Sequence, residues 1–369
     1  SPCDPPNYLL QQGTICQTKG IDLNNPHRIR YHEYSMPTLR KFLKKINIDA
    51  ELAFDEPMAY HTSFRIGGPA DALVRPRSAE DLSRLLLAAE AEGIPVAVIG
   101  GGANLLVADA GVRGLVVATS LLRRFEVEAA VDTSFTAGCG SSAAEGGTGA
   151  PGGFTVRVGA GLAVTELLTR LLEQGLSGME FAAGLPGSVG GAVYMNARCY
   201  DYEMADVLDA VLYLDPMDRQ PRLVGIQKQE WAYKRTPFMA GGTLAGAVII
   251  GACFRLRPGD RTIMSARMTE LEADRRAKGH FDYPCAGSLF KNDRRFGRPT
   301  GQILDELGFR GRRIGDAMVS QKHANIFVNT GRASAKDILA LVNEARAAAL
   351  AAFGFELEPE VVTLGDFSL

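Results

Sequence analysis

The sequence has no long hydrophobic run, no excess of charge of either sign and no clustered cysteines. No apolar stretch approaches the roughly 18–20 residues that span a bilayer, so we expect no membrane-spanning helix. Lys plus Arg number 40 and Asp plus Glu number 42, which leaves a formal net charge of −2. A protein that binds nucleic acid through its phosphates needs a basic excess. We therefore expect neither a membrane nor a nucleic acid as a partner.

The six cysteines are too few and too scattered for a disulfide scaffold. None belongs to a Cys-x-x-Cys pair, which also excludes a zinc ribbon. We interpret them as reduced thiols of a cytoplasmic protein and expect no metal centre. They are Cys3, Cys16, Cys139, Cys199, Cys253 and Cys285.

Glycine, by contrast, is abundant, with 41 of 369 residues, about 11% against a usual 7%. Residues 100–102 are all Gly, and they lie between a strand predicted over 95–99 and strand-like residues 105–107. Backbone amides at glycines can turn inward and cradle an anion. A dinucleotide fingerprint would need Gly where Leu105 stands, followed directly by a helix, and a P-loop would need Gly-Lys-Ser/Thr. Neither is present, and this block alone is equally compatible with a structural turn.

A second block carries four glycines in eight residues, from Gly184 to Gly191. Two such loops suit a long ligand with a pyrophosphate and a flat ring system. We expect the backbone at Gly190 and Gly191 to lie against the face of that ring. A third Gly/Ser/Ala-rich stretch, residues 138–153, is not required by the surrounding pattern, and we interpret it as a flexible hairpin insertion.

Five motifs occur in a fixed order along the chain. They are HTSFRIGGPA from His61, GGGANLLV from Gly100, GLPGSVGGAVYMN from Gly184, AGSLFKN from Ala286 and LEPEV from Leu357. In these motifs the chain resembles the UDP-N-acetylenolpyruvoylglucosamine reductase family over nearly all of residues 37–366. The resemblance implies an α+β fold, in which a vanillyl-alcohol-oxidase-type FAD-binding fold of two subdomains is joined by a separate α+β substrate-binding domain.

The alternation of strand and helix patterns places domain boundaries near residues 120 and 260. Helices are predicted to begin after Ser78 and Ser334, each followed by an acidic residue three positions on, and a further helix over 164–174 is predicted to end at Gly175. The expected division is a mobile extension at 1–35, FAD-binding subdomains at 36–120 and 121–260, the substrate-binding domain at 261–356, and a C-terminal segment at 357–369 that returns toward the flavin.

The resemblance implies an NADPH-dependent flavoenzyme of peptidoglycan precursor synthesis. We expect this chain to be a monomer. Its substrate would be the small molecule UDP-N-acetylglucosamine-enolpyruvate, reduced to UDP-N-acetylmuramate. FAD would take a hydride from NADPH and deliver it to C3 of the enolpyruvyl group, while a proton reaches C2. Such chemistry requires a hydride carrier, a proton donor and groups that stabilise an anionic intermediate.

Two catalytic positions match the family. Ser288 matches the proton donor, although a Ser between Gly and Leu would otherwise be interpreted as a turn hydroxyl. Glu360, directly after Pro359, matches the group that donates to or polarises the substrate carboxylate as a partly buried, protonated acid. Without the resemblance it would be interpreted as a solvated charge.

A third catalytic position departs from the family. Where the family usually has Tyr-Arg-x-Ser, this chain has Tyr233-Lys-Arg-Thr, so Lys234 stands at the Arg place and Arg235 follows it. A guanidinium holds a carboxylate through two parallel hydrogen bonds, which a lysine cannot do. Adjacent residues of an extended chain point to opposite sides, so one of the two serves this role, and we favour Lys234.

The resemblance also assigns binding residues. The expected FAD contacts are Arg65, Gly67, Gly100, Gly101, Gly102, Ala103, Asn104, Leu105, Gly187, Ser188, Gly191 and Asn196. The expected substrate contacts are Tyr233, Lys278, Lys291, Asn292 and His323, with a structural role as the alternative for His323. His61 stands where Asn is commoner in the family.

The short stretch between Tyr233 and Cys253 implies the subclass of the family that lacks a long loop whose Tyr closes over the substrate. Two other functions stay open. One is another FAD-dependent oxidoreductase of the same superfamily, such as an oxidase, although an oxidase needs a base rather than the Ser288 and Glu360 motifs. The other is a non-catalytic flavin- or nucleotide-sugar-binding protein that lost its activity at Lys234.

Overall fold

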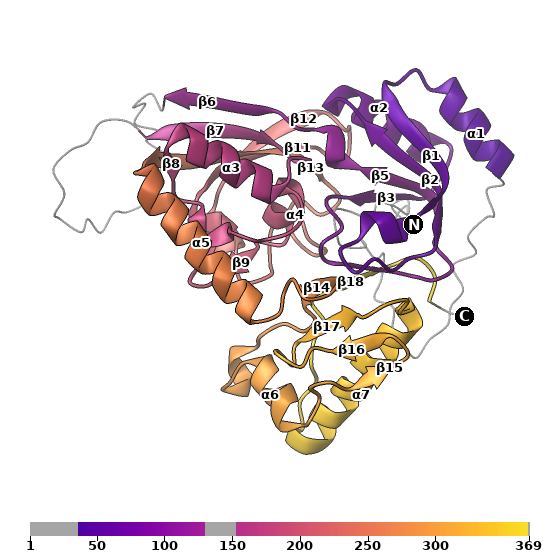
Figure 1. Ribbon diagram of the computed structural model, residues 1–369. Helices are drawn as coiled ribbons and strands as arrows, with labels where there is room; N and C mark the ends of the chain where they lie inside the picture. The colour runs from indigo at the N-terminus through magenta and orange to yellow at the C-terminus, as the bar shows by residue number, and fades with distance from the viewer. Residues whose placement is uncertain (1–35, 130–152, 368–369) are drawn as a thin grey trace, which may run out of the picture.

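The computed structural model describes residues 36–129 and 153–367 (Figure 1). The described residues form three larger β-sheets, of four, six and four strands, and two two-stranded pairs. The larger sheets fall within residues 50–118, 125–258 and 285–329. The expected extension at 1–35 and all but the last residue of the expected insertion at 138–153 lie outside the described residues.

The first sheet has the order β1-β2-β5-β3, in which β1 runs antiparallel to β2, and β2 and β3 run parallel to β5. Alternate residues of β5 enter two different cores, because successive side chains of a strand point to opposite faces: Leu115 and Val117 pack under the helices, and Val116 and Ala118 on the other face. The Ser78 side chain caps α2, as predicted. The elements are α1 Met36–Lys45, β1 Ala50–Pro57, β2 Pro69–Pro76, α2 Ala79–Ala91, β3 Val96–Ile99 and β5 Val112–Ala118.

The second sheet has the order β12-β11-β13-β7-β6, and β8 also pairs with β13. Helix α3 spans the predicted residues and ends at Gly175, whose φ of +65° is the left-handed conformation. Helix α5 packs on this unit through Leu271, although the sequence placed it in the substrate-binding domain. The elements are β6 Phe125–Ala129, β7 Phe154–Gly159, α3 Val164–Gln174, β8 Leu176–Ser177, α4 Val189–Tyr194, β9 Arg198–Cys199, β10 Tyr202–Glu203, β11 Leu208–Leu214, β12 Pro221–Gly225, β13 Val248–Pro258 and α5 Arg261–Ala277.

The third sheet, of order β14-β17-β16-β15, packs against α6 and α7. The predicted capping box of α7 is present, with Ser334 and Asp337 bonded to each other's backbone. This unit docks on the first, because Asn329 donates to the Phe64 carbonyl (3.1 Å) and the Asp109 carboxylate accepts from the Ala335 amide (2.8 Å). The elements are β14 Cys285–Ser288, α6 Thr300–Glu306, β15 Arg313–Ile314, β16 Ala317–Val319, β17 Ile326–Asn329 and α7 Ala335–Phe353.

The C-terminal segment leaves the third unit and returns to the first. Strand β18, Val362–Leu364, lies parallel to β4, Leu105–Val107. Pro359 forms an isolated bridge with Phe290 before that strand begins at Val362. This path carries residue 360 past the loop that joins β3 to β4.

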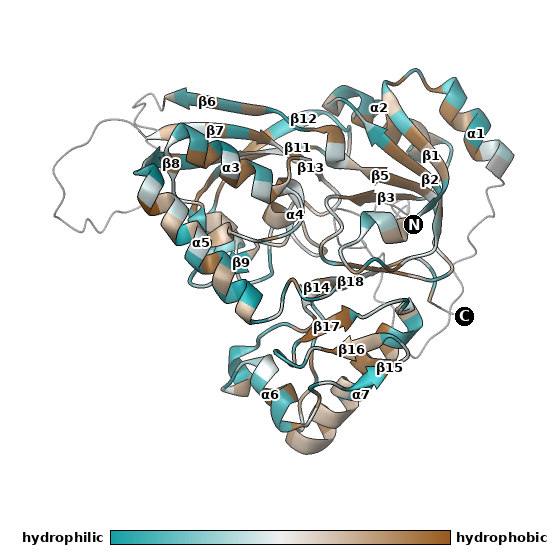
Figure 2. Cartoon of the chain, in the orientation of Figure 1, coloured by the Kyte–Doolittle hydropathy of each residue, from teal (hydrophilic) through white to brown (hydrophobic). Residues whose placement is uncertain are grey.

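The apolar residues are concentrated in the interior strands. In Figure 2, β3, β5 and β17 are largely brown, whereas β6 and β15 are largely teal. Among the helices within 36–129 and 153–367, none has the length and apolar character needed to cross a membrane.

Candidate active site

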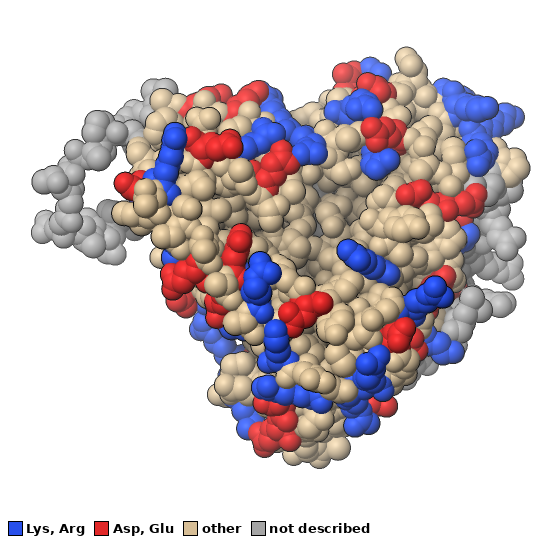
Figure 3. Space-filling view, in the orientation of Figure 1, with Lys and Arg blue, Asp and Glu red and all other residues tan. Residues whose placement is uncertain are grey.

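A cavity of about 870 Å³ lies where the three units meet, a size typical of small-molecule sites. Figure 3 shows the surface hollowed near the centre of this face. Segments far apart in the sequence line the cavity. They include 100–105, 185–188, Gly191, Ala192, Met195, 197–200, Tyr233, Lys234, Arg275, His280, 286–288, 292–294, Glu358 and Glu360.

The two glycine blocks touch each other at one side of the cavity. A methyl group on Gly101 would lie 2.6 Å from the Cα of Gly187 and 2.7 Å from the amide nitrogen of Ser188. The Gly101 amide itself donates to the Ser188 hydroxyl at 3.1 Å. Only glycine fits this contact, and the predicted strand–loop–strand arrangement is present because β4 follows the loop directly.

The segment that starts at His61 lies behind the first loop and does not reach the cavity. Gly102 has φ of +64°, and a methyl group there would lie 1.9 Å from the His61 carbonyl oxygen. Ser63 donates from its amide to the Gly102 carbonyl (3.1 Å). Arg65, which is exposed, and Gly67, which packs on Val107, are not among the lining residues. The motif therefore supports the loop from outside.

The second block is a turn that leads into α4. The Ser188 hydroxyl accepts from the Gly191 amide (3.4 Å), which caps this short helix. Gly191 lines the cavity, but Gly190 is buried on the other side, where its amide donates to the Ala160 carbonyl at 2.8 Å. Of the two glycines expected beside a flat ring, one faces the cavity.

A tight turn presents Tyr233 and Lys234 to the cavity. Ala232 and Arg235 exchange two backbone hydrogen bonds of 3.0 Å, and Lys234 between them has φ of +54°. The turn directs Lys234 inward and leaves Arg235 exposed outside the lining. Asn196, expected to contact FAD, is fully buried and instead donates to the Ala232 carbonyl at 3.0 Å. It anchors the turn.

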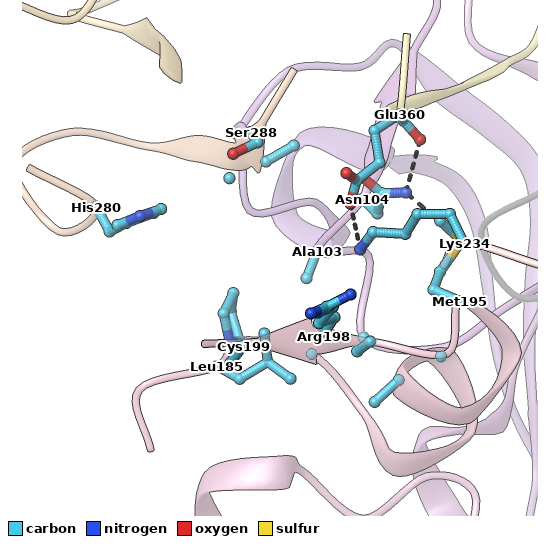
Figure 4. A pocket seen from close by; sticks show the side chains of 18 of the residues that line it. Ala103, Asn104, Leu185, Met195, Arg198, Cys199, Lys234, His280, Ser288 and Glu360 are labelled. Atoms are coloured by element: carbon cyan, nitrogen blue, oxygen red, sulfur yellow. Dashed lines mark hydrogen bonds and ion pairs between the residues drawn. The ribbon is translucent and has the colours of Figure 1, made fainter. Parts of the chain in front are cut away.

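Lys234 and Glu360 form an ion pair inside the cavity. Their Nζ and Oε1 atoms lie 2.6 Å apart, and the side chains are only 10% and 12% exposed. Asn104 donates to the Glu360 carbonyl at 3.0 Å, which ties the first glycine loop to the C-terminal segment (Figure 4). The Lys234–Glu360 contact brings the two side chains expected at the substrate carboxylate together on one wall of the cavity.

Ser288 lies at the end of β14, where Gly287 before it has φ of +75°. Its side chain lines the cavity together with Glu360 and Lys234. Among the described residues, no hydrogen bond uses the Ser288 hydroxyl. A turn hydroxyl normally bonds the nearby backbone, so this hydroxyl is available to a ligand.

Tyr233 and Asn292 close the same part of the cavity. The Tyr233 hydroxyl accepts from the Asn292 amide at 3.3 Å. Burial, and then the carboxylate of Glu360, raises the pKa of Tyr233, so this hydroxyl stays neutral at physiological pH. The Asn292 side chain is already engaged, since its oxygen accepts from the Thr300 amide at 2.9 Å.

Three further residues expected at the substrate lie outside the lining. Lys278 pairs with Asp274 and Lys291 pairs with Glu358, both at 2.6 Å. The ring of His323 packs on Gly301 and accepts from the Asn325 amide at 3.2 Å. Its position fits the structural alternative.

The structure also places in the cavity wall residues to which the sequence assigned no role in the site. His280, after α5, is partly buried, and its burial together with the charges of Arg275, His323 and Lys278 lowers its pKa to about 4. Cys199 on β9 has a raised pKa because it is buried. Arg198 and Cys199 lie shortly after the second glycine motif, which ends at Asn196, but no local pattern marks them as site residues.

Within the described residues, the charged side chains of the cavity wall that lack an ion-pair partner are cationic. Its three lining carboxylates, on Asp293, Glu358 and Glu360, are each paired with a Lys or Arg. Three lining arginines form no ion pair within the described part of the chain. They are Arg198, Arg275 and Arg294. Such a cavity suits an anionic ligand. The same described residues contain no cluster of His, Cys, Asp and Glu that could hold a metal ion.

Comparisons with known proteins match both parts of the chain. A family model described as UDP-N-acetylenolpyruvoylglucosamine reductase, C-terminal domain, matches residues 279–364. A model described as FAD binding domain matches residues 70–145 and 149–224. Both glycine blocks lie in the FAD-binding match, and Ser288 and Glu360 lie in the C-terminal match, whereas the lining residues Tyr233, Lys234 and Arg275 lie between the two matches.

Whole proteins give the same result. The UDP-N-acetylenolpyruvoylglucosamine reductase of Agathobacter rectalis is 40% identical over 316 residues, which cover 85% of this chain and 94% of that protein. The enzyme of the same name from Treponema denticola is 34% identical over 326 residues, covering 86% and 95%. The crystal structure of UDP-N-acetylenolpyruvylglucosamine reductase from Thermus caldophilus has a TM-score of 0.65 and 28% identity, over 86% of this chain and 100% of that one.

Proposed function

The chain belongs to the UDP-N-acetylenolpyruvoylglucosamine reductase family, and from this premise we propose how its own residues carry the reaction. Its activity is that of an FAD-dependent UDP-N-acetylmuramate dehydrogenase of peptidoglycan precursor synthesis. The observation that carries the proposal is that the two glycine loops meet Ser288 and the Lys234–Glu360 pair in one cavity.

The residues present fit FAD. The contact at Gly101 brings the backbones of the two glycine loops together at the cavity wall, and backbone amides can lie close to a pyrophosphate or ring. We assign FAD contacts to the lining members of the two blocks. These are Gly100–Leu105, Gly187, Ser188 and Gly191. When bound, FAD supplies the hydride for C3 of the enolpyruvyl group, and NADPH is its proposed source.

Ser288 is the proposed proton donor to C2. Addition of a hydride at C3 leaves negative charge on C2 and the carboxylate, so C2 must gain a proton to complete the lactyl ether. The Ser288 hydroxyl has no hydrogen-bond partner among the described residues and faces the cavity. A serine is a weak acid, and the excess of cationic groups lining this cavity favours the anion that proton transfer leaves behind.

Glu360 and Lys234 are the proposed groups at the substrate carboxylate. Lys234 offers a cation where the enolate charge develops, which is the usual way to stabilise such an intermediate. Glu360 holds the ammonium in place at 2.6 Å. Tyr233 and Asn292 are proposed substrate contacts, whereas Lys278, Lys291 and His323 are left out because they do not line the cavity. Residues 236–247 join the turn directly to β13, which supports the subclass without a long lid loop.

The half-reactions test this proposal. The purified protein should show the absorption bands of bound flavin, and NADPH should bleach them under anaerobic conditions. Ser288→Ala should leave that bleaching intact but slow reoxidation by UDP-N-acetylglucosamine-enolpyruvate by several orders of magnitude. Ser265→Ala, at an exposed position of α5, is the matched control. Equal loss of both half-reactions in Ser288→Ala would contradict the assigned role, and a colourless protein that binds no flavin would overturn the function.

A further inference from the structure

Arg198 is an arginine in the wall of the active site to which no role has been given above. It begins β9, directly after the segment that anchors the Tyr233–Lys234 turn. Its side chain is partly buried and lines the cavity. Figure 4 shows its guanidinium between Cys199 and Lys234, on the side of the cavity that also holds Ala103. Within the described chain it donates a single, long hydrogen bond of 3.5 Å, from Nε to the Tyr200 carbonyl.

The charges near Lys234 leave an anionic substrate without a balancing cation. Lys234 and Glu360 neutralise each other at 2.6 Å. A substrate carboxylate brought to this pair adds a second negative charge, which Glu360 repels. One further cation restores the balance, and in a partly buried site an unbalanced carboxylate is costly. Arg198 is such a cation, because it forms no ion pair with an acidic side chain of the described residues.

Lys234 and Arg198 also differ in how they bind a carboxylate. A lysine ammonium is a point charge, whereas a guanidinium presents a planar fork that binds both oxygens of a carboxylate at once. Lys234 stands where the family usually has that fork, and Arg235 is directed away from the cavity. We propose that Arg198 provides the fork and binds the carboxylate of the enolpyruvyl group, so that this chain carries the guanidinium on β9 instead of on the Tyr233 turn. This inference rests on the proposed function.

Arg198 is better placed for this role than the other two free arginines. Burial is the chief cause that raises the pKa of Tyr233, and the charges of Lys234 and Arg198 oppose it. Because Arg198 is close enough to act on this hydroxyl, it belongs to the Tyr233–Glu360 end of the cavity. Arg275 acts instead on Cys199 and His280, toward α5. Arg294 is exposed. These two suit the diphosphate of a nucleotide sugar.

A pair of ligands that differ by the lactyl group, which bears the carboxylate, tests the proposal. UDP-N-acetylmuramate carries the carboxylate, and UDP-N-acetylglucosamine lacks the whole lactyl group. Binding of both to the oxidised holoprotein is measured by calorimetry. In Arg198→Ala, the affinity for UDP-N-acetylmuramate should fall about 10- to 100-fold, as expected for loss of a charged hydrogen-bonded partner. The affinity for UDP-N-acetylglucosamine should change less than about twofold.

Two further variants separate the fork from the charge and from the fold. Arg198→Lys keeps the charge and should recover only part of the lost affinity. Arg255→Ala, on β13 with a side chain 70% exposed, should leave both affinities unchanged. Lys234→Arg added to Arg198→Ala should restore part of the affinity for UDP-N-acetylmuramate alone, because it returns a guanidinium to the same carboxylate.

Several results would overturn the assignment of Arg198. Equal weakening of both ligands in Arg198→Ala would place this arginine at the diphosphate, and loss of bound flavin would place it at FAD. Unchanged binding of UDP-N-acetylmuramate would remove it from the site. These outcomes differ from failure of the proposed function, in which the wild-type holoprotein would bind neither ligand, and the Arg198 proposal would fall with it.

Discussion

Replacement of Gly101 by alanine tests whether contact between the two glycine blocks makes the flavin site. Gly101 does not have a positive φ, so only steric contact, and not the backbone conformation, opposes the substitution. The added methyl group would meet the Gly187 Cα at 2.6 Å, the Ser188 nitrogen at 2.7 Å and the Gly187 carbonyl carbon at 2.8 Å. All three are backbone atoms, which cannot rotate away as the end of a side chain can.

The size of the effect follows from these distances. Ordinary contact begins at 3.4 Å, so the two loops must separate by about 0.8 Å at this point. Overpacking of this kind typically costs about 1–3 kcal/mol. Neither Gly101 nor Gly187 belongs to a hydrophobic core, so we expect the cost to fall on ligand binding. FAD affinity should drop roughly 5- to 150-fold.

The assay is titration of FAD into flavin-free protein, followed by the flavin-to-protein ratio after desalting. Gly225→Ala is the control, because a methyl group there meets nothing closer than the Asp209 carbonyl at 4.0 Å. The melting temperature without FAD checks that Gly101→Ala still folds. If Gly101→Ala binds FAD within about twofold of the wild type, the contact between the loops does not shape the flavin site and this reasoning is refuted.

Two other changes give further tests. Lys234→Ala should slow flavin reoxidation by substrate at least tenfold, because it leaves Glu360 without its cation, whereas Arg235→Ala should have a much smaller effect; the reverse result would show that the turn is misassigned. The pKa of His280 is lowered to about 4, because the folded protein favours the neutral imidazole. Its contribution to the free energy of unfolding is fully present above the usual pKa of 6.5 and is lost as the pH falls from 6.5 toward 4. The melting temperature of the wild type should therefore fall more between pH 7 and pH 5 than that of His280→Gln, and parallel curves would contradict this.

Short-range signals explain what the sequence could predict. The start of helix α7 was predicted from Ser334 and the end of α3 from Gly175, because capping signals act within one or two turns. The glycine blocks were recognisable because glycine is needed where two backbones touch. The family, the fold and the activity followed from motifs of this local kind.

The composition of the active site depended instead on how the units pack. Lys278, Lys291 and His323 are suitable residue types, but ion pairs or burial hold them away from the cavity. Arg198 and His280 reach it although no local pattern marks them.

Residues 234 and 235 show most directly what the sequence leaves undecided and the tertiary structure decides. Both are cationic and adjacent, so composition and spacing treat them alike. A turn with positive φ at Lys234, anchored by Asn196, directs one inward and the other to solvent. That choice requires contacts between segments 36 residues apart, and pairing with Glu360 requires the chain to return from the third unit. Local patterns carry no information about such distant contacts, and the three-dimensional packing supplies it.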